Sequence, residues 1–451
     1  MTVAADQTAV APSRAEPWPK PAQAWYAVFI FALALMMDFL DRGVIGFLVH
    51  PIETDLHLSD SQIGLVTGLA YVGFYAFIAL PIARLADTRK RRTIVGVGVV
   101  VWSAATALCG FAQNFWQLFL ARMGVGAGEA CNGPPVFSMI SDLFPREKLP
   151  RAIAVLNFGF IAGTGLASIF AGGVIRFFSS MPPVVLPFVG ALHPWQMTFI
   201  AVGIPGVIIG LLMWTVKEPI RRGRISKDKA GMPIGDIVKF FVDNRATYAP
   251  MFLGLGFNMI PSVGLIFWSA EYFRRSFHMQ PADYALYAGA ISVVVAPIGA
   301  IFGSRMAEKF YAAGRDDANI RVVLLAFLFN VPGLIGLTLA PTPQIAFAIF
   351  AYTQFVAMWV PGPFNAALQV VTPNEMRAQI TALFLFIFNI IGYGLGPSVV
   401  AFITQYVFHD PAMLRYSLTT VMIILMPPAA ISLWWGMKAY GESVARAKTW
   451  D

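Results

Sequence analysis

Long apolar stretches separated by short polar segments recur along the whole chain. A helix that crosses a bilayer needs about 20 predominantly apolar residues, and windows of that size occur twelve times. Apolar residues occupy nearly every face of these windows, and segments of alternating polarity are absent, so the pattern predicts helices and no strands. The predicted spans are residues 25–49, 61–83, 93–112, 115–140, 152–178, 195–216, 247–270, 283–304, 321–340, 343–369, 377–407 and 415–437.

The composition agrees with this pattern. Of the 451 residues, 57% are hydrophobic and 12% are charged, and the mean hydropathy is +0.67. Soluble domains are roughly 45–50% apolar and about 25% charged, so a soluble fold cannot bury this much apolar surface. The sequence therefore predicts an all-α integral membrane protein with twelve transmembrane helices.

Basic residues are distributed unequally between the two sets of loops. Most of the 32 Lys and Arg residues lie in the tails and in alternate loops, whereas the opposite loops hold Arg176, Arg274, Arg275 and Arg415. The positive-inside rule then places both termini in the cytoplasm and predicts a multi-pass protein of the inner membrane. The net charge of +8 is explained by this topology and requires no nucleic-acid partner.

One long polar stretch divides the predicted spans into two sets of six. We expect a cytoplasmic tail at residues 1–24, which lack the pattern of a signal peptide, and a second tail at 441–451. Between them we expect a six-helix bundle at 25–216, a cytoplasmic linker at 217–246 and a second six-helix bundle at 247–440. The end of the linker, residues 234–244, alternates apolar and charged positions with helical spacing and predicts an interfacial helix.

The two halves resemble each other at corresponding loops. Ala83-Arg-Leu-Ala-Asp87 follows the second span, and Ser304-Arg-Met-Ala-Glu308 follows the eighth. Pro-x-Glu followed by Arg-Ala also recurs, after the fourth span and after the tenth. Parallel repeats of this kind are typical of secondary transporters, whose substrate site lies at the interface of the repeats near the membrane midplane.

Ionisable residues inside the spans are costly and usually functional. The first span carries Asp38, Asp41 and Arg42, and the fourth carries Arg122 and Glu129. Helical geometry places each set within one sector of its helix, so we expect the two charged stripes to face each other across a cavity. Carboxylates beside movable arginines bind a proton with an affinity that depends on conformation. Asp41, Arg42, Glu129 and Arg122 are the predicted proton-coupling residues; static buried pairs are the alternative.

The predicted C-terminal spans offer neutral polar groups instead of charges. Asn258, Gln354 and Asn389 lie in the seventh, tenth and eleventh spans, with Trp359 near Gln354. Together with Asp38 they are the predicted walls of the substrate cavity. Such a cavity suits an amphipathic or anionic organic molecule, although each amide alone could form an ordinary hydrogen bond between helices.

Glycines four residues apart recur in several spans, including Gly64 with Gly68 and Gly392 with Gly396. They allow close approach of helix backbones, as in packed or sliding membrane helices. In the loop after the second span, Arg84, Asp87 and Arg91 are the predicted cytoplasmic gate, because an acid there can bind a helix N-terminus or an arginine of a neighbouring loop. No metal-binding or nucleophile motif appears, which predicts a protein that is not an enzyme and uses no cofactor.

The same loop, Ala83-x-x-x-Asp87-Thr-Arg-Lys-Arg-Arg92, resembles the cytoplasmic motif Gly-x-x-x-Asp-Arg-x-Gly-Arg-Arg of the major facilitator superfamily. Ala83 replaces the leading glycine and Thr88 replaces an arginine, but the spacing of Asp87 and Arg91 is kept. The resemblance implies the major facilitator fold.

More narrowly, three segments resemble the Spinster family: Asp41-Arg42-Gly-Val-Ile-Gly46, Arg122-x-Gly-Val-Gly-Ala-Gly-Glu129-Ala and Ser138-Met-Ile-Ser-Asp-Leu-Phe144. The resemblance covers the N-terminal half well and the C-terminal half mainly in its plan of spans. It implies a carrier of lysophospholipid or sphingosine-1-phosphate type, in which Asp41 and Arg42 sense the proton with Glu129 and Arg122 as partners.

These observations predict a monomeric, proton-coupled secondary transporter that moves an amphipathic lipid by alternating access. Its expected partners are the substrate, protons and the lipid bilayer. The alternative is a proton-coupled transporter of small organic anions or drugs. A lipid-modifying enzyme or a sensor is the third possibility, and the absence of catalytic motifs argues against it.

Overall fold

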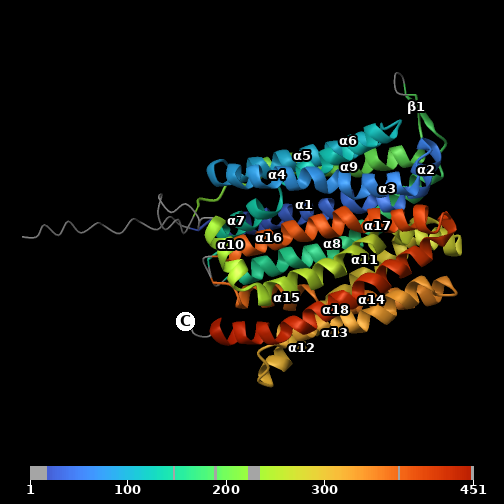
Figure 1. Ribbon diagram of the computed structural model, residues 1–451. Helices are drawn as coiled ribbons and strands as arrows, with labels where there is room; N and C mark the ends of the chain where they lie inside the picture. Colours follow the sequence, from blue (N-terminus) through green and yellow to red (C-terminus); the bar gives the residue numbers. More distant parts are fainter. Residues whose placement is uncertain (1–17, 146–147, 187–189, 222–233, 374–375, 448–451) are drawn as a thin grey trace, which may run out of the picture.

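The computed structural model describes residues 18–145, 148–186, 190–221, 234–373 and 376–447, and most of them are helical (Figure 1). The first half consists of α1 (Pro21–Phe47), α2 (Val49–Leu56), α3 (Asp60–Thr67), α4 (Leu69–Thr88), α5 (Arg91–Cys109), α6 (Phe115–Glu129), α7 (Gly133–Leu143), α8 (Leu149–Ser179), α9 (Pro194–Leu212) and the 3-10 turn η1 (Met213–Thr215).

The second half consists of α10 (Ile234–Asp243), α11 (Arg245–Phe277), α12 (Pro281–Ala312), α13 (Ala318–Thr338), α14 (Pro343–Ala357), α15 (Pro361–Val370), α16 (Arg377–Asn389), the π-helical η2 (Ile390–Leu395), α17 (Gly396–Phe402), the π-helical η3 (Ile403–Val407), the 3-10 turn η4 (Pro411–Met413) and α18 (Leu414–Ala447). Its helix α10 lies where the sequence predicts an interfacial helix.

Local chemistry explains where several elements begin and break. Ser59 and Gln62 form a reciprocal capping box that starts α3, which satisfies two backbone N–H groups of the first turn. A break at Gly68 separates α3 from α4, and Pro361 opens α15 after the break that follows α14. Gly392 and Gly394 lie within the π-helical turn η2, and Gly396 follows it directly; π-helical turns are frequent at functional sites.

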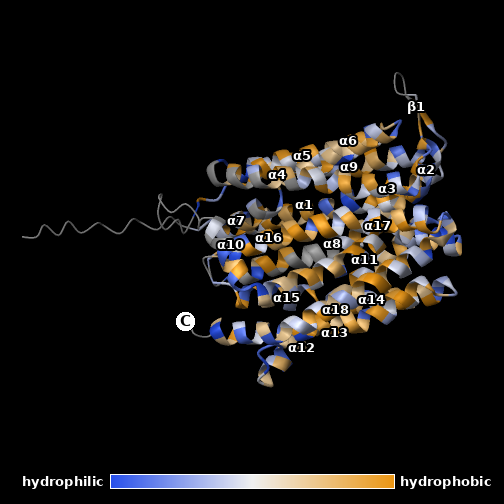
Figure 2. Cartoon of the chain, in the orientation of Figure 1, coloured by the Kyte–Doolittle hydropathy of each residue, from blue (hydrophilic) through white to orange (hydrophobic). Residues whose placement is uncertain are grey.

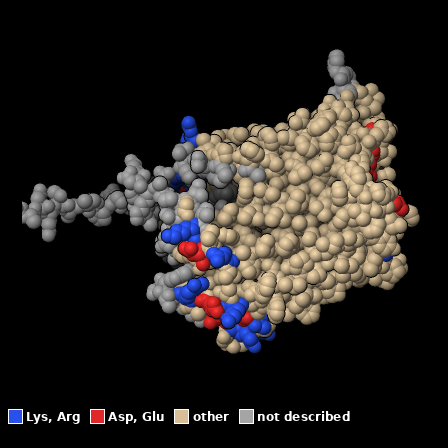
Figure 3. Space-filling model, viewed as in Figure 1, with Lys and Arg blue, Asp and Glu red and all other residues tan. Residues whose placement is uncertain are grey.

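Nine helices of the described residues are long and apolar enough to cross a membrane. The remaining predicted spans coincide with α1, with α6 and α7 together, and with α8, of which α1 and α6 carry the buried charges. Hydrophobic residues cover the sides of the bundle in Figure 2, and the face in Figure 3 has a broad band without Lys, Arg, Asp or Glu. The arrangement is an all-α membrane fold, and the charged groups on the face in Figure 3 are gathered towards its two ends.

Two details differ from the expectation. Strands β1 (Val184–Leu186) and β2 (Gly190–Leu192) form an antiparallel hairpin, with Val185 opposite Ala191, where the sequence predicted no strands. Gly190 has φ of 91°, a conformation that favours glycine and suits a tight turn. The helix α11 also extends to Phe277, so Arg274 and Arg275 lie in its last turn and not in a loop.

The two halves pack together unevenly along the bundle. We call the end where α1 begins and α18 ends the terminal end, and the opposite end, with α2 and β1, the distal end (Figure 1). A large apolar cluster joins the first half to the distal parts of α11, α12, α13 and α18. The terminal parts of α11, α13 and α18 belong to a separate cluster with α15 and α16, and the described residues of this cluster all come from the second half. The apolar cores of the halves are therefore joined at the distal end.

Glycines permit the close contact between α3, α4 and the segment η2–α17. A Cβ atom built on Gly68 would lie 2.7 Å from the carbonyl oxygen of Gly394, and one built on Gly64 would lie 2.8 Å from the Cβ atom of Ala401. The Ser398 hydroxyl donates a hydrogen bond of 3.1 Å to the carbonyl oxygen of Gly64. The small-residue faces predicted from the sequence thus meet each other between the two halves.

We expect Gly68→Ala to separate the halves at the distal end, because the new methyl group meets a backbone carbonyl that cannot rotate away. Overpacking costs about 1–3 kcal/mol, which corresponds to a shift of about 5–150-fold towards the open state. Spin labels at exposed Thr54 on α2 and Ala412 in η4 measure the separation. Gly73→Ala is the control, since nothing lies within 4 Å of a Cβ atom at that position of α4; equal distances in both variants would contradict the prediction.

Candidate functional site

A buried charge cluster joins α1 to α6 in the first half. Arg42 Nε lies 2.6 Å from Asp38 Oδ1 and 2.6 Å from Glu129 Oε2. The Tyr71 hydroxyl on α4 donates a hydrogen bond of 2.5 Å to the same Glu129 oxygen. Asp38 is 6% exposed and Glu129 is 2% exposed, so the arginine compensates carboxylates that are almost fully removed from water.

Aromatic rings connect this cluster to the second half. The Arg42 guanidinium lies 5.1 Å from the ring centre of Tyr71 and 5.5 Å from that of Tyr393. Tyr393 belongs to the π-helical turn η2, and its ring also contacts those of Tyr71 and Phe267. A guanidinium over aromatic faces gains cation–π stabilisation. Arg42 is thus the charged group through which α1 contacts the opposite half.

Asp41 and Arg122 make other contacts than the Arg42 ion pairs, although the Arg122 guanidinium also lies 5.9 Å from the ring centre of Tyr71. The Asp41 side chain is 0% exposed and approaches Trp102 and Thr106 of α5. Arg122 Nη1 donates a hydrogen bond of 3.0 Å to the backbone carbonyl of Asp41, and no ion pair of the Asp41 carboxylate occurs among the described residues. The sequence placed Asp41, Asp38 and Arg42 in one sector; the structure separates them because Asp41 lies on the edge that faces α5.

The four predicted cavity residues of the second half do not form one cluster. Gln354 donates a hydrogen bond of 3.1 Å to the Ser292 hydroxyl of α12, and Asn389 donates to the Leu385 carbonyl of its own helix. Trp359 packs with Phe302, Phe355 and other apolar side chains of α12, α13 and α14. Asn258 lies buried on α11. Within the described residues no hydrogen bond joins two of these four, and Gln354 makes the helix-to-helix bond that was the alternative.

Arg91 holds together the terminal end of the first half. It forms an ion pair of 2.5 Å with Asp142 of α7 and one of 3.2 Å with Glu218, and it donates to the Ser138 hydroxyl at 2.7 Å. Arg84 and Asp87 lie in α4, but their side chains are outside the described part of the chain. Of the three predicted gate residues, Arg91 alone is therefore placed by its contacts, all within the first half.

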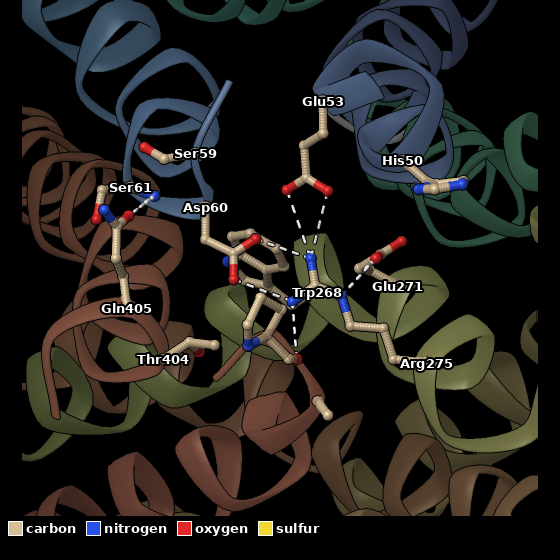
Figure 4. Close-up of polar contacts among 12 residues, drawn as sticks. His50, Glu53, Ser59, Asp60, Ser61, Trp268, Glu271, Arg275, Thr404 and Gln405 are labelled. Carbon is tan, nitrogen blue, oxygen red and sulfur yellow. Dashed lines mark hydrogen bonds and ion pairs between the residues drawn. The ribbon is translucent and has the colours of Figure 1, made fainter. Parts of the chain in front are cut away.

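The distal end contains an ion cluster that the sequence did not predict (Figure 4). Arg275 of α11 binds Asp60 of α3 at 2.7 Å and Glu53 of α2 at 3.4 Å, and it binds Glu271 of its own helix at 2.5 Å. Its Nη1 group also donates to the Pro411 carbonyl at 3.0 Å. One buried arginine of the second half therefore contacts two carboxylates of the first half.

Further contacts between the halves lie beside this cluster. The backbone N–H of Ser61 donates a hydrogen bond of 3.0 Å to Gln405 Oε1 (Figure 4). Arg176 at the end of α8 lies 3.8 Å from Asp283 at the start of α12, in an exposed pair. The polar and apolar contacts both show a bundle that is joined at the distal end.

A signal for the distal cluster exists in the sequence. Glu271 stands three and four residues before Arg274 and Arg275, the spacing of ion pairs along a helix, and Arg274 is 2.6 Å from Glu271. The spacing predicts that the helix continues to Arg275. It contains no information about Glu53 and Asp60, which come from more than 200 positions earlier in the chain.

The apolar helical bundle, its buried charges and its two joined halves define the class of protein: a multi-pass membrane transporter, which is not an enzyme. The chain belongs to the Major Facilitator Superfamily, to which residues 31–397 match.

Comparisons with individual proteins confirm the resemblance to Spinster proteins. The "MFS-type efflux pump" of Mycolicibacterium smegmatis is 25% identical over 94% of this chain and 95% of its own length. The "Probable sphingolipid transporter spinster homolog 2" of Arabidopsis thaliana is 22% identical over 93% of this chain and 87% of its own. A crystal structure of a bacterial homologue of the human lysosomal transporter Spinster, described as inward-facing and unoccupied, superposes with a TM-score of 0.76, at 24% identity, over 96% of this chain and 99% of the other.

Proposed function

We propose that the protein is a proton-coupled secondary transporter that moves an amphipathic lipid across the membrane by alternating access. The observation that carries the proposal is the ion pair of 2.6 Å between Arg42 and Glu129, formed beside a tyrosine of the opposite half. Protonation of Glu129 removes the charge that binds Arg42 to α6, while Asp38 still binds Arg42 within α1. Arg42 is then free to change its position against Tyr393, so that proton binding alters the contact between the halves.

The proposed cycle follows from the uneven packing of the halves. In this conformation the ion cluster around Arg275 and the apolar cluster close the distal end. The separate cluster of the second half leaves the terminal end as the side of access. Rocking of the halves about the glycine contact of α3 and α4 with η2–α17 would reverse this arrangement. If the termini are cytoplasmic, as the distribution of basic residues favours, this conformation is inward-facing in the inner membrane.

The lipid substrate is supported by chemistry and by one relative. Arg42 provides a cation beside the opposite half, which suits an anionic headgroup, while the apolar walls of the bundle suit a hydrocarbon tail. The Arabidopsis relative carries the name of a probable sphingolipid transporter. The Mycolicibacterium relative, matched over nearly both full lengths, carries the name of an efflux pump, which favours a drug or an organic anion as the second candidate. In both cases we propose a monomer without a cofactor, driven by the proton gradient.

We expect Glu129→Gln and Asp41→Asn each to reduce substrate-driven proton flux at least tenfold in proteoliposomes. Each variant keeps the shape of its side chain but removes the group that binds the proton. The substrates offered are a lysophospholipid, a sphingoid phosphate and a cationic dye. Flux with a lipid but not with the dye supports the lipid transporter, and the reverse supports the second candidate.

The matched control is Glu308→Gln, which removes an exposed carboxylate of α12 and should leave the flux unchanged. All variants are compared after purification as folded monodisperse protein. If lipid moves with its normal proton flux in both Glu129→Gln and Asp41→Asn, the charged groups are static pairs and proton coupling at this site is ruled out.

A further inference from the structure

The Asp41 carboxylate takes no part in the ion pairs of the Arg42 cluster. Both of its oxygens are buried and form no hydrogen bond among the described residues. Buried carboxylate oxygens are usually hydrogen-bonded. The polar groups around Asp41 therefore indicate which hydrogen bonds its carboxylate can accept. Those groups come from α5, α6 and α9.

Helix α5 contributes three polar groups that are also buried without a hydrogen-bond partner in the described structure. Trp102, Ser103 and Thr106 are each 0% exposed, and Trp102 Nε1, Ser103 Oγ and Thr106 Oγ1 all lack a hydrogen-bond partner among the described residues. Trp102 and Thr106 are four residues apart and share a face of the helix. Both side chains lie beside the Asp41 carboxylate.

Helix α9 leaves space for the Ser103 hydroxyl because it has a glycine, Gly206, at this contact. A Cβ atom built on Gly206 would lie 2.1 Å from Ser103 Oγ and 4.0 Å from Asp41 Oδ2. The glycine thus lets the Ser103 hydroxyl and the carboxylate occupy one space between α5 and α9. An indole N–H and two hydroxyl groups, all able to donate a hydrogen bond, surround one buried carboxylate.

The charged and titratable groups near Asp41 are few. Asp38 lies on the same helix and Arg122 on α6, while the Cys109 thiol on α5 lies near both Arg122 and Asp41. Arg122 uses Nη1 for the backbone carbonyl of Asp41, and its Nε and Nη2 form no hydrogen bond among the described residues. No side chain therefore forms a direct ion pair with the Asp41 carboxylate in the described structure.

We propose that Thr106, Ser103 and Trp102 of α5 are positioning residues that donate hydrogen bonds to the ionised Asp41 carboxylate and so set the pH at which the transporter releases this proton. The inference rests on the proposed function, because it assigns Asp41 as a proton-binding group. Ionised carboxylates only accept hydrogen bonds, whereas a protonated one must use its O–H as a donor. Donors on α5 therefore favour the ionised form.

The test is the pH dependence of substrate-driven proton flux in proteoliposomes. Thr106→Val keeps the shape but removes the hydroxyl group, so Asp41 should release its proton at a higher pH; we expect the midpoint to rise by about one pH unit. Trp102→Phe should shift it in the same direction. Thr106→Ser restores the hydroxyl and should restore the midpoint, which a purely structural role of the methyl group would not predict.

Thr93→Val, a partly buried position on the same helix, is the matched control and should leave the midpoint unchanged. As a second measurement, infrared difference spectra report the C=O stretch of the protonated Asp41 carboxyl, identified by its loss in Asp41→Asn. This band should shift in Thr106→Val and return in Thr106→Ser, even if transport by the variant is weak.

The outcomes separate the two proposals. Normal proton flux in Asp41→Asn would overturn Asp41 as a coupling acid and the α5 inference with it. Loss of flux in Asp41→Asn, with an unchanged midpoint and an unchanged infrared band in Thr106→Val, would overturn the α5 inference alone.

Discussion

Replacing Arg275 with alanine is expected to open the distal end of the bundle. The Arg275 side chain is 7% exposed and binds Glu53, Asp60 and Glu271, so its removal leaves the carboxylates of Asp60 and Glu271 close together without their shared cation. Breaking a buried ion pair costs about 3–5 kcal/mol. The cost falls on the closed state, because the carboxylates gain access to water once the halves separate. We therefore expect the ratio of closed to open molecules to fall by a factor of at least about 100.

Spin labels at Thr54 and Ala412 measure this change as a longer distance between α2 and η4. Arg274→Ala is a matched control, because Arg274 is the preceding residue, is more exposed and binds Glu271 within its own helix. It should leave the distance distribution close to that of the unaltered protein. A closed distal end in Arg275→Ala, with labels at the original separation, would show that the apolar cluster closes this end without the arginine.

The sequence predicted the helical architecture well because its signal is local. An apolar window of about 20 residues can satisfy its backbone in lipid only as a helix, whichever residues lie next to it. The hairpin of β1 and β2 was missed for the opposite reason. Each strand has only three residues, too few for an alternating pattern, and pairing depends on the turn at Gly190.

The candidate site was predictable as a set of residues but not as a geometry. The charged positions of α1 and α6 stand out from their apolar surroundings, and Arg42 does bind Glu129. Helical angles gave the positions of Asp38 and Asp41 relative to each other. They gave no information about which neighbouring helix lies opposite each one, and the position of α5 decides that Asp41 is separated from Arg42.

The distal cluster could not be predicted because it depends on contacts between the halves. Asp60 stands at the first turn of α3 and also suits a helix N-terminus, and Glu53 belongs to a helix of eight residues. Neither position identifies Arg275 as a partner. Only the packing of α11 against the first half brings these groups together.

Closure of the distal end is also expected to weaken as the pH rises. Burial raises the pKa of the Glu53 carboxyl to about 9, assisted by the neighbouring Asp60, while Arg275 opposes the shift. In the open state Glu53 is exposed to water and titrates near its ordinary value of about 4.3. The closed state therefore holds one proton more than the open state between about pH 5 and pH 9. Within that window, we expect the ratio of closed to open molecules to fall about tenfold for each unit of pH.

The direction of this pH dependence follows from the raised pKa of Glu53 in the closed state. The stabilisation is complete at a pH below the open-state value and is lost as the pH rises through about 9. His50, on the same helix, faces Glu271 and Arg274, and burial together with Arg274 lowers its pKa. Its effect on closure is confined to pH values near and below the ordinary histidine pKa of about 6.5, where it opposes the effect of Glu53. The remaining groups of the cluster, Asp60 and Arg275, stay paired with each other.

Glu53→Gln tests this interpretation directly, because it keeps a neutral side chain of the same size at every pH. The distance between labels at Thr54 and Ala412 should then show no dependence on pH between about 7 and 9, whereas the unaltered protein should open progressively over this range. Asp55→Asn removes a neighbouring carboxylate of α2 that binds Trp195 and not Arg275, so it should keep the original dependence. A slope that persists in Glu53→Gln would assign the proton to another group of the distal end. Loss of the slope would show that each closure of this end binds a proton at Glu53, and therefore that the cycle exchanges protons at the distal end.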